Sequence, residues 1–494
     1  MNERTFHVLV VAPLRAGEDH ARCAPWTEPV RFERATFDEA MASVAPAVAI
    51  DVADPASPRG KPLRIELAFP AMRAFRPDVL LSDVPFLKGL AARAPAPPPA
   101  PAGGSLVDDI LASMGSPAEV GGGATPSAGA ALAALLGHPE VRSLERAWRG
   151  LHFLASRADR DAVIVSALAA SAGEVDAALE RVARRPDAAE IDLIVVDHAI
   201  GSARRDLDRL ESWATRAEGI GAPLVANGLA ELVGLDDLGA LGRTQRRLQS
   251  SDDPRASAVR SVAARDVTRW IALALNGAVA RPRHAGPVAR AADVRLDEAE
   301  DLFLGPAYLV ASRVVASFQE TGWPCAISGP TRGVVGSLPV HDVDDRGTRV
   351  ATPLEALASE EAAAEAAAAG LILLASAVDR DVAVVSHART LYRGASTAGG
   401  ASPAAAHGLA DQLFVARLAK AIVQLAAAIP SDTPDDAARD VARVALADLF
   451  GDAPRRPELE IALTGAPRCL EVTVRPRGFF GVRLEEATLG VPLG

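Results

Sequence analysis

Hydrophobic positions along this chain follow two periods, and the alternation between them predicts a mixed α/β fold. In the first 93 residues, apolar runs typical of strands alternate with segments whose apolar residues recur at helical spacing. Prolines mark helix starts in the last of these segments. The predicted elements are strands at 6–11, 47–52 and 63–69, and helices at 36–44 and 75–90. We therefore expect a small α/β module over residues 1–93.

A larger α/β module is predicted over residues 131–494, subdivided near residue 290. Its first part alternates helices with apolar strands, which is typical of a parallel sheet with crossover helices, and its end reads as an antiparallel sheet. Trp148 and Leu151 lie on the apolar face of its first helix, so we expect both in the core. The predicted helices are 138–156, 174–184, 203–218, 298–320, 404–428 and 434–450. The predicted strands are 162–168, 192–197, 223–226, 371–376, 382–386, 458–463, 470–475 and 482–490.

Residues 94–130 form a Pro- and Gly-rich linker with one amphipathic segment at 105–114. Ser105 is a candidate N-cap of a short helix there, and Asp108 stands at its third position. Such a helix commonly docks in a groove on a partner; on pattern alone, folding back onto its own protein is equally expected. Its apolar stripe consists of Leu106, Val107, Ile110, Leu111 and Met114.

Composition excludes several classes of function. With 52 Lys and Arg against 63 Asp and Glu, the net charge of −11 argues against nucleic-acid binding, which needs clustered excess cation. The three cysteines are scattered and fit neither a disulfide framework nor a zinc site, which suits a reducing compartment. The longest apolar stretch, near 408–429, carries charges that a bilayer core would penalise, and the apolar run at 6–14 lacks the basic lead of a signal peptide. We expect a cytoplasmic protein without membrane insertion.

Motifs for nucleotide binding and nucleophilic catalysis are absent from the sequence. The strand predicted at 162–168 runs into AASAGEV, whose single glycine does not make a phosphate-binding turn. No P-loop or GxSxG elbow occurs. His198 follows Asp197 at the end of a predicted strand, and a polar pair at the strand end is favoured there over a catalytic role.

Metal binding is weakly indicated at one place only. Asp342, Asp344 and Gly347 fall at the first, third and sixth positions of a calcium-loop pattern. Arg346 and Pro353 occupy the fifth and twelfth positions, where oxygen ligands are needed, so a solvated turn between strands is favoured. The sequence therefore predicts no catalytic residue, no cofactor and no metal.

Distinctive motifs stand in a recognisable order along the chain. LRIELAF and VPFLKGL occur in the small module, AWRGL opens the large one, and GWP followed by LPVH comes later. This series resembles the contractile sheath of the type VI secretion system, with its small subunit (TssB or VipA) and large subunit (TssC or VipB) fused in one chain. The resemblance implies that the motif residues belong to the core. The motif residues of the large module are Trp148, Arg149, Gly150, Leu151, Trp323, Leu338, Pro339 and His341.

The resemblance implies a structural protomer and not an enzyme. Such a protomer polymerises into a helical tube around an inner tube protein and contracts to drive it, in the bacterial cytoplasm. Implied partners are other copies of the chain, the inner tube, baseplate components and a ClpV-type AAA+ unfoldase that binds the helix containing Ser105, Leu106, Val107, Asp108, Ile110 and Leu111. Two alternatives stay open. The first is a sheath homologue that caps or regulates without polymerising, and the second, less favoured, is an α/β enzyme using the sheet at 162–227.

The chain departs from the family pattern in ways that affect assembly. The small subunit's extended strand before the first core strand is missing, and its long C-terminal helix is replaced by the linker. The terminal strand predicted at 482–490 is kept. We therefore expect weaker lateral linkage than in a two-chain sheath. The fusion itself raises the effective concentration of the two halves to roughly millimolar and enforces one-to-one pairing.

Overall fold

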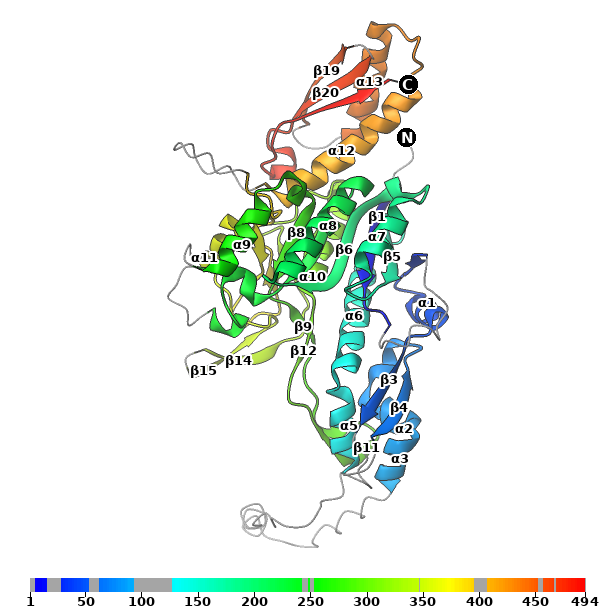
Figure 1. The fold of residues 1–494 in the computed structure, drawn as a ribbon, viewed down its shortest axis with the longest axis vertical. Helices are drawn as coiled ribbons and strands as arrows, with labels where there is room; N and C mark the ends of the chain where they lie inside the picture. Colours follow the sequence, from blue (N-terminus) through cyan, green and yellow to red (C-terminus); the bar gives the residue numbers. More distant parts are fainter. Residues whose placement is uncertain are drawn as a thin grey trace.

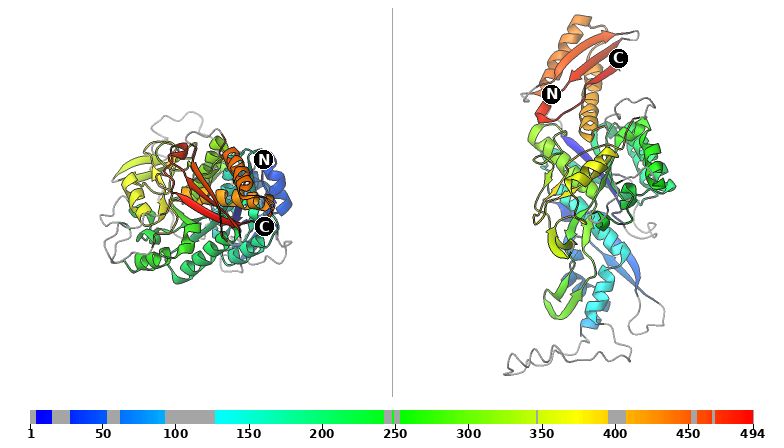
Figure 2. Two further views of the ribbon diagram at one scale, coloured as in Figure 1. Left: turned by 90° about the horizontal axis from the view of Figure 1, so that it is seen from above. Right: turned by 90° about the vertical axis from the view of Figure 1, so that its left-hand side faces the viewer.

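The computed structural model describes residues 5–15, 28–52, 62–92, 127–241, 248, 253–345, 347–394, 407–451, 456–465 and 468–493. The described parts form three regions along one long axis (Figure 1). We call the central region the body. The lower lobe lies at one end of it, and the arm, residues 409–492, lies at the other. The side view shows the same order (Figure 2).

A seven-stranded sheet forms the centre of the body, in the order β16-β8-β7-β6-β1-β5-β2. Strand β1 (Phe6–Ala12) lies between β5 (Val163–Ala169) and β6 (Ile191–Ile200) and is parallel to both. The other strands are β2 (Val30–Arg31), β7 (Leu224–Gly228), β8 (Ile271–Leu275) and β16 (Leu371–Leu373). Strands β1 and β2 of the N-terminal segment therefore share one sheet with strands from residues 163–373.

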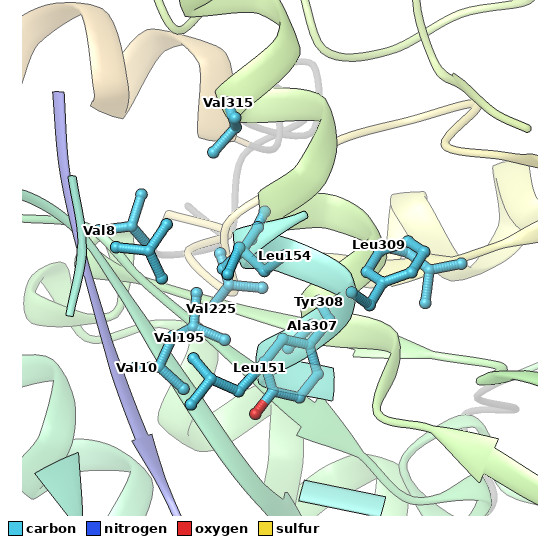
Figure 3. Packing of buried hydrophobic residues seen from close by; sticks show 14 of the residues in the cluster. Val8, Val10, Leu151, Leu154, Val195, Val225, Ala307, Tyr308, Leu309 and Val315 are labelled. Carbon is cyan, nitrogen blue, oxygen red and sulfur yellow. The ribbon is translucent and has the colours of Figure 1, made fainter. Parts of the chain in front are cut away.

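Helices cover both faces of this sheet. On one face lie α6 (Pro139–Ala155), α10 (Pro306–Thr321) and the first part of α12 (Leu409–Ala428). On the other lie α7 (Val175–Ala183), α8 (Arg204–Ile220), α9 (Pro254–Ala263) and α11 (Glu360–Ala368). Alternate residues of β1 enter the two cores, because successive strand side chains point to opposite faces. Figure 3 shows Val8 and Val10 beside Leu151 and Leu154 of α6.

The lower lobe combines elements from the first 136 residues with one hairpin from the middle of the sequence. Its elements are α1 (Phe37–Val44), β3 (Ala47–Val52), β4 (Leu63–Ala68), α2 (Pro77–Asp83), α3 (Pro85–Ala92), α5 (Ala128–Leu136), β10 (Ala285–Val288) and β11 (Ala291–Asp297). Helix α5 packs against both α3 and β11. Gly129 permits this approach, because a Cβ there would lie 1.8 Å from the Arg295 carbonyl oxygen.

Short strand pairs line the side of the body. They are β9 (Ala278–Arg281) with β12 (Leu302–Leu304), β14 (His341–Asp345) with β15 (Thr348–Thr352), and β18 (Ala383–Val384) between β13 (Val334–Val335) and β17 (Ala375–Ser376). The turn between β14 and β15 contains Asp344 and Gly347 of the calcium-loop pattern. There the Gly347 N–H donates to Asp344 Oδ1 at 2.7 Å, as in an ordinary turn.

The mixed α/β fold class, with a parallel sheet and a C-terminal antiparallel sheet, is confirmed. The division of the sequence into modules at 1–93, 94–130 and 131–494 stays a prediction, and in space the outer two share a sheet and a core. Several predicted elements differ from the structure. The helix at 75–90 is two helices, α2 and α3, and the strand at 371–376 is divided between β16 and β17, which lie in different sheets. Three predicted elements are wrong at their starts, and one of them, the helix at 404–428, begins only at Leu409. The helix at 298–320 begins only at Pro306, because residues 302–304 pair with β9. The strand at 482–490 becomes β21 (Ala487–Pro492), because the segment before it packs against the base of the arm.

Candidate assembly surface and its supports

The arm ends in a small antiparallel sheet with open edges. It contains β19 (Glu458–Thr464), β20 (Cys469–Arg475) and β21 in that order, backed by α12 and α13 (Asp435–Phe450). Leu470, Val472 and Val474 of β20 are buried beneath the sheet, whereas alternate residues of β21 are exposed. Over the described residues, β19 and β21 each pair with β20 alone, so each has backbone groups directed away from the sheet. Such edges can accept a further strand.

Charged pairs cross the exposed face of this sheet. Arg475 donates to Glu460 at 3.0 Å and to Glu486 at 3.0 Å, and so links β20 to β19 and to the residue before β21. Thr473 and Thr488 form a hydrogen bond of 2.9 Å between β20 and β21. These contacts fix the register of the three strands while leaving their outer edges open.

An aromatic cluster joins the arm to the body. The Trp323 ring lies 5.1 Å from Phe450, 5.2 Å from Phe414 and 5.4 Å from Phe479, measured between centroids. Trp323 follows α10 of the body, and the three phenylalanines belong to the arm. Trp323 of the GWP motif therefore anchors the arm. The periodicity of the sequence does not predict that these four rings form one cluster.

The start of α12 is fixed by a buried carboxylate. Asp411 Oδ1 accepts a 2.8 Å hydrogen bond from the Glu485 backbone N–H, which holds the segment before β21 against the start of α12 at the base of the arm. Burial raises the pKa of Asp411, and the hydrogen bond from Glu485 opposes that shift.

A groove runs between the arm and the body. Its volume is about 1500 Å³, and it is lined by the end of α10, by α12 and α13, and by residues next to the start of β1. Arg417 lines it and stacks over the ring of Phe318 at 4.8 Å. The groove lies beside the point where the N-terminal strand enters the sheet.

The AWRGL motif ties the N-terminal segment to α6. Trp148 is fully buried, donates from Nε1 to the Leu14 carbonyl at 3.2 Å, and meets the rings of Phe32 and Phe37 edge-on. Gly150 leaves room for Tyr308, since a Cβ at this position would lie 2.2 Å from its ring. Trp148, Gly150 and Leu151 are thus core residues.

Arg149 and the LPVH motif have other places. Arg149 is only partly buried and donates to Glu145 at 2.7 Å. In LPVH, Leu338 is buried, Pro339 is exposed and His341 is partly buried. Arg149, Pro339 and His341 are therefore not core residues, and the expectation for these three is wrong. Pro339 precedes an exposed hairpin, and His341 joins that hairpin to the body by polar bonds, from its two ring nitrogens to Asp301 Oδ2 at 3.0 Å and to the Leu354 carbonyl at 2.8 Å.

A buried ion cluster lies beside α6 and was not foreseen from the sequence. Arg281 at the end of β9 makes paired bonds to Glu145, at 2.8 and 3.1 Å, and to Glu298, at 2.6 and 2.9 Å. All three side chains are less than a tenth exposed. The two carboxylates raise the pKa of Arg281 against the opposing effect of burial, so the arginine stays charged. The cluster fixes α6 against the strands that lead to the lower lobe.

The carboxyl ends of the parallel strands, where α/β enzymes often bind ligands, are occupied by the protein's own groups. Asn227 donates to Asp197 Oδ1 at 2.7 Å and accepts from the Ala307 N–H at 3.0 Å. His198 Nε2 lies 2.9 Å from the Ala170 carbonyl, and burial lowers the pKa of His198. These contacts favour the interpretation of Asp197 and His198 as polar groups at the strand end.

Several further observations are limited to the described part of the chain. There, no group of His, Cys, Asp and Glu is arranged to hold a metal ion. No helix within the described ranges is long and apolar enough to span a membrane. The helix predicted at 105–114, with Ser105, Leu106, Val107, Asp108, Ile110 and Leu111, lies outside the described residues.

Comparisons with known proteins agree with the motif series. Residues 185–392 match the family model of the VipB (EvpB) tail sheath N-terminal domain, and residues 1–94 match that of the type VI secretion system protein VipA. The type VI secretion system sheath protein TssC1 of Pseudomonas aeruginosa is 23% identical over 288 residues, which cover 52% of this chain. The match spans 58% of TssC1, less than two thirds of its length.

A cryo-EM structure of the anti-feeding prophage baseplate has a chain that is 13% identical to this one, with a TM-score of 0.36, over 70% of this chain and 77% of that one. This likeness is too slight to support a conclusion. The two family models instead cover separate parts of one polypeptide, in the order small subunit, then large subunit. The chain therefore belongs to the sheath protein family of type VI secretion systems, with its VipA and VipB parts joined in a single polypeptide.

Proposed function

We propose that this protein is a fused sheath protomer, which polymerises in the bacterial cytoplasm into a tube around an inner tube protein and contracts to drive it. The observation that carries the proposal is the arm sheet at the far end of the molecule, whose outer strands pair with β20 alone among the residues that the structure describes. Members of this family link protomers partly by exchanging strands. A strand from a second copy can pair with an open edge through backbone hydrogen bonds alone.

The geometry of the arm suits that role. The sheet stands away from the body on α12, where a neighbouring copy can reach it (Figure 2). Its apolar underside is covered by α12 and α13, so a new strand at either edge would extend an existing covered layer. No catalysis and no cofactor is needed for this function, and contraction would be a switch between two packed states of the polymer.

The direct test is assembly of the purified full-length chain. Tubes that sediment and are visible by negative-stain electron microscopy are the expected result. Dispersed protein at every concentration would contradict polymerisation by this chain alone, and would favour the homologue that caps or regulates a sheath.

A variant of β21 tests the arm directly. Gly490 is exposed, and a side chain there meets nothing within 4 Å, so Gly490→Lys is compatible with folding while it adds charge to the open edge strand. We expect fewer or shorter tubes. The matched control is Gly173→Lys, at an equally open position on the body, and equal loss in both variants would contradict assembly through the arm.

Disassembly is proposed to use the segment at 105–114, by resemblance to the family. Leu106 and Ile110 would enter a groove on a ClpV-type unfoldase, and truncation of such an apolar anchor typically costs about 2 kcal/mol. Leu106→Asp with Ile110→Asp should abolish capture of the unfoldase while assembly persists. Undiminished capture would mean that the unfoldase binds elsewhere.

Baseplate components are proposed as further partners, again from the family. Their contact would place the first ring of protomers at one end of the tube. Copurification of baseplate proteins with assembled tubes, compared with the Gly490→Lys variant, tests this contact.

A further inference from the structure

Helix α12 connects the body to the arm and changes its surroundings along its length. Up to Leu418 its inward residues are buried with the body and the aromatic cluster. Beyond this point the helix packs under the arm sheet, and Val423 is 52% exposed. Lys420 lies at the place where α12 leaves the body, so its contacts bear on the direction of the arm.

The Lys420 side chain reaches back into the body sheet. Its Nζ donates to the Ile191 carbonyl and lies 3.4 Å from Asp192 Oδ1. The two side chains are 11% and 5% exposed. An ion pair this deeply buried is sensitive to geometry, because loss of one partner leaves the other charge desolvated.

Asp192 also binds the N-terminal strand. Its second oxygen, Oδ2, accepts a 3.0 Å hydrogen bond from the His7 backbone N–H of β1. His7 Nε2 lies 2.6 Å from Ser166 Oγ of β5. One carboxylate at the start of β6 therefore connects α12 of the arm to the strand that begins at the N-terminal end of the chain.

A second cation on α12, Arg417, contacts a different part of the body. Arg417 lies one turn before Lys420 and stacks over Phe318 at 4.8 Å and Trp323 at 5.4 Å. Phe318 lies near the end of α10 and Trp323 just after it, whereas Asp192 belongs to β6. The groove between arm and body opens beside Arg417. Helix α12 is therefore held by side-chain contacts where it leaves the body, although one of its sides borders the groove.

We infer that Lys420 is the positioning residue of the arm, and that its ion pair with Asp192 fixes the direction in which α12 leaves the body and couples that direction to β1. The coupling stands on the contacts within one chain. In a tube, this coupling would fix the spacing between a protomer's arm and its N-terminal strand. That consequence rests on the proposed function.

The composition of the chain supplies a specific probe. Lysine occurs only at positions 61, 88 and 420, so an amine-acetylating reagent followed by mass spectrometry reports on few sites. Lys88 on α3 is exposed and serves as the internal reference. Burial and the contact with Asp192 should make Lys420 at least about tenfold slower to react than Lys88. Equal rates at the two lysines would overturn the inference.

Asp192→Asn separates the charge from the packing, because asparagine has nearly the same size and can still accept the His7 N–H. We expect acetylation of Lys420 to rise severalfold, and amide exchange to rise in the second half of α12, while Lys88 is unchanged. The matched control is Asp208→Asn on α8, an exposed carboxylate paired with Arg204, which should change neither readout. Lys420 as protected in Asp192→Asn as in the wild type would overturn the inference.

Imaging of the same samples separates the inference from the proposed function. Protein that protects Lys420 but forms no tubes would contradict polymerisation and leave the positioning role supported. Tubes in which Lys420 reacts as fast as Lys88 would contradict the positioning role and leave polymerisation supported.

Discussion

In the body, β1 is buried on both faces between two layers of helices, whereas in the arm β20 is buried on one face only. The strands at the centre of the body sheet run parallel and are buried, and the short edge strand β2 is antiparallel to them. The arm strands are antiparallel with alternate residues exposed. A sheet buried on both faces contributes apolar area from every residue, and one covered on a single face contributes from every second residue. The body is therefore expected to carry most of the stability, and the arm to remain available for contacts between molecules.

The lower lobe and the arm also differ in how they are joined to the body. The lower lobe and the body share α6 and the buried ion cluster around Arg281. The arm is attached to the body by the aromatic cluster and by Lys420. Few attachments make the arm sensitive to single substitutions, and this difference can be tested.

The largest effect is expected in the body, at Arg281. Arg281→Leu leaves Glu298 buried without its arginine and Glu145 paired only with the partly buried Arg149, and it should lower the free energy of unfolding by about 3–5 kcal/mol. Chemical denaturation measures this. Arg475→Leu in the arm removes an arginine that also binds two carboxylates, but both are exposed, so its cost should be within about 1 kcal/mol. Similar costs for the two variants would contradict the comparison.

A smaller effect, confined to the arm, is expected at Trp323. Trp323→Ala removes the ring around which Phe414, Phe450 and Phe479 pack, at a cost of about 3 kcal/mol. Because the ring holds the arm to the body, limited proteolysis should release fragments from 409–492 before the body is cleaved. Simultaneous cleavage of both regions would show that they unfold as one unit.

A third effect is expected at the glycine of the AWRGL motif. Gly150→Ala forces a methyl group against the Tyr308 ring and should cost about 1–3 kcal/mol by overpacking. Gly219→Ala on α8 meets nothing within 4 Å and should be neutral or should stabilise by up to about 1 kcal/mol. Thermal melting checks this: the melting temperature should fall for Gly150→Ala and should stay the same or rise for Gly219→Ala.

The smallest effects are expected from pH, and their signs differ between the regions. Burial lowers the pKa of His198 in the body, so its contribution to stability is present above the ordinary histidine pKa of about 6.5 and is lost as the pH falls. His198→Gln, which keeps a hydrogen-bond donor, should flatten this part of the stability profile. His387→Gln, at a partly exposed histidine, is the control.

Asp411 should respond in the opposite direction. Burial raises the pKa of this carboxyl, so its contribution is present at low pH and is lost as the pH rises through the folded-state pKa. Asp411→Asn keeps an oxygen for the Glu485 N–H and should make the stability of the base of the arm less dependent on pH. Proteolytic release of the arm at several pH values measures this, and an unchanged profile would show that Asp411 does not govern it.

The sequence by itself determined the local structure and the family. Period-two runs gave β3 and β4, helical periodicity gave α6 and α8, and proline marked the starts of α2 and α3. The AWRGL and GWP motifs gave the family, which the family models support. These features depend on neighbours within a few residues, and the sequence displays such neighbours directly.

Only the tertiary structure decided which distant segments meet. Nothing in the pattern of residues 6–12 places β1 between β5 and β6, because any apolar strand can occupy the centre of a parallel sheet. The ion pair between Lys420 and Asp192 joins residues 228 positions apart, and the ring cluster at Trp323 gathers four segments of chain. Charged and aromatic side chains carry no periodicity that identifies their partners, so their pairing follows from the packing of the whole fold.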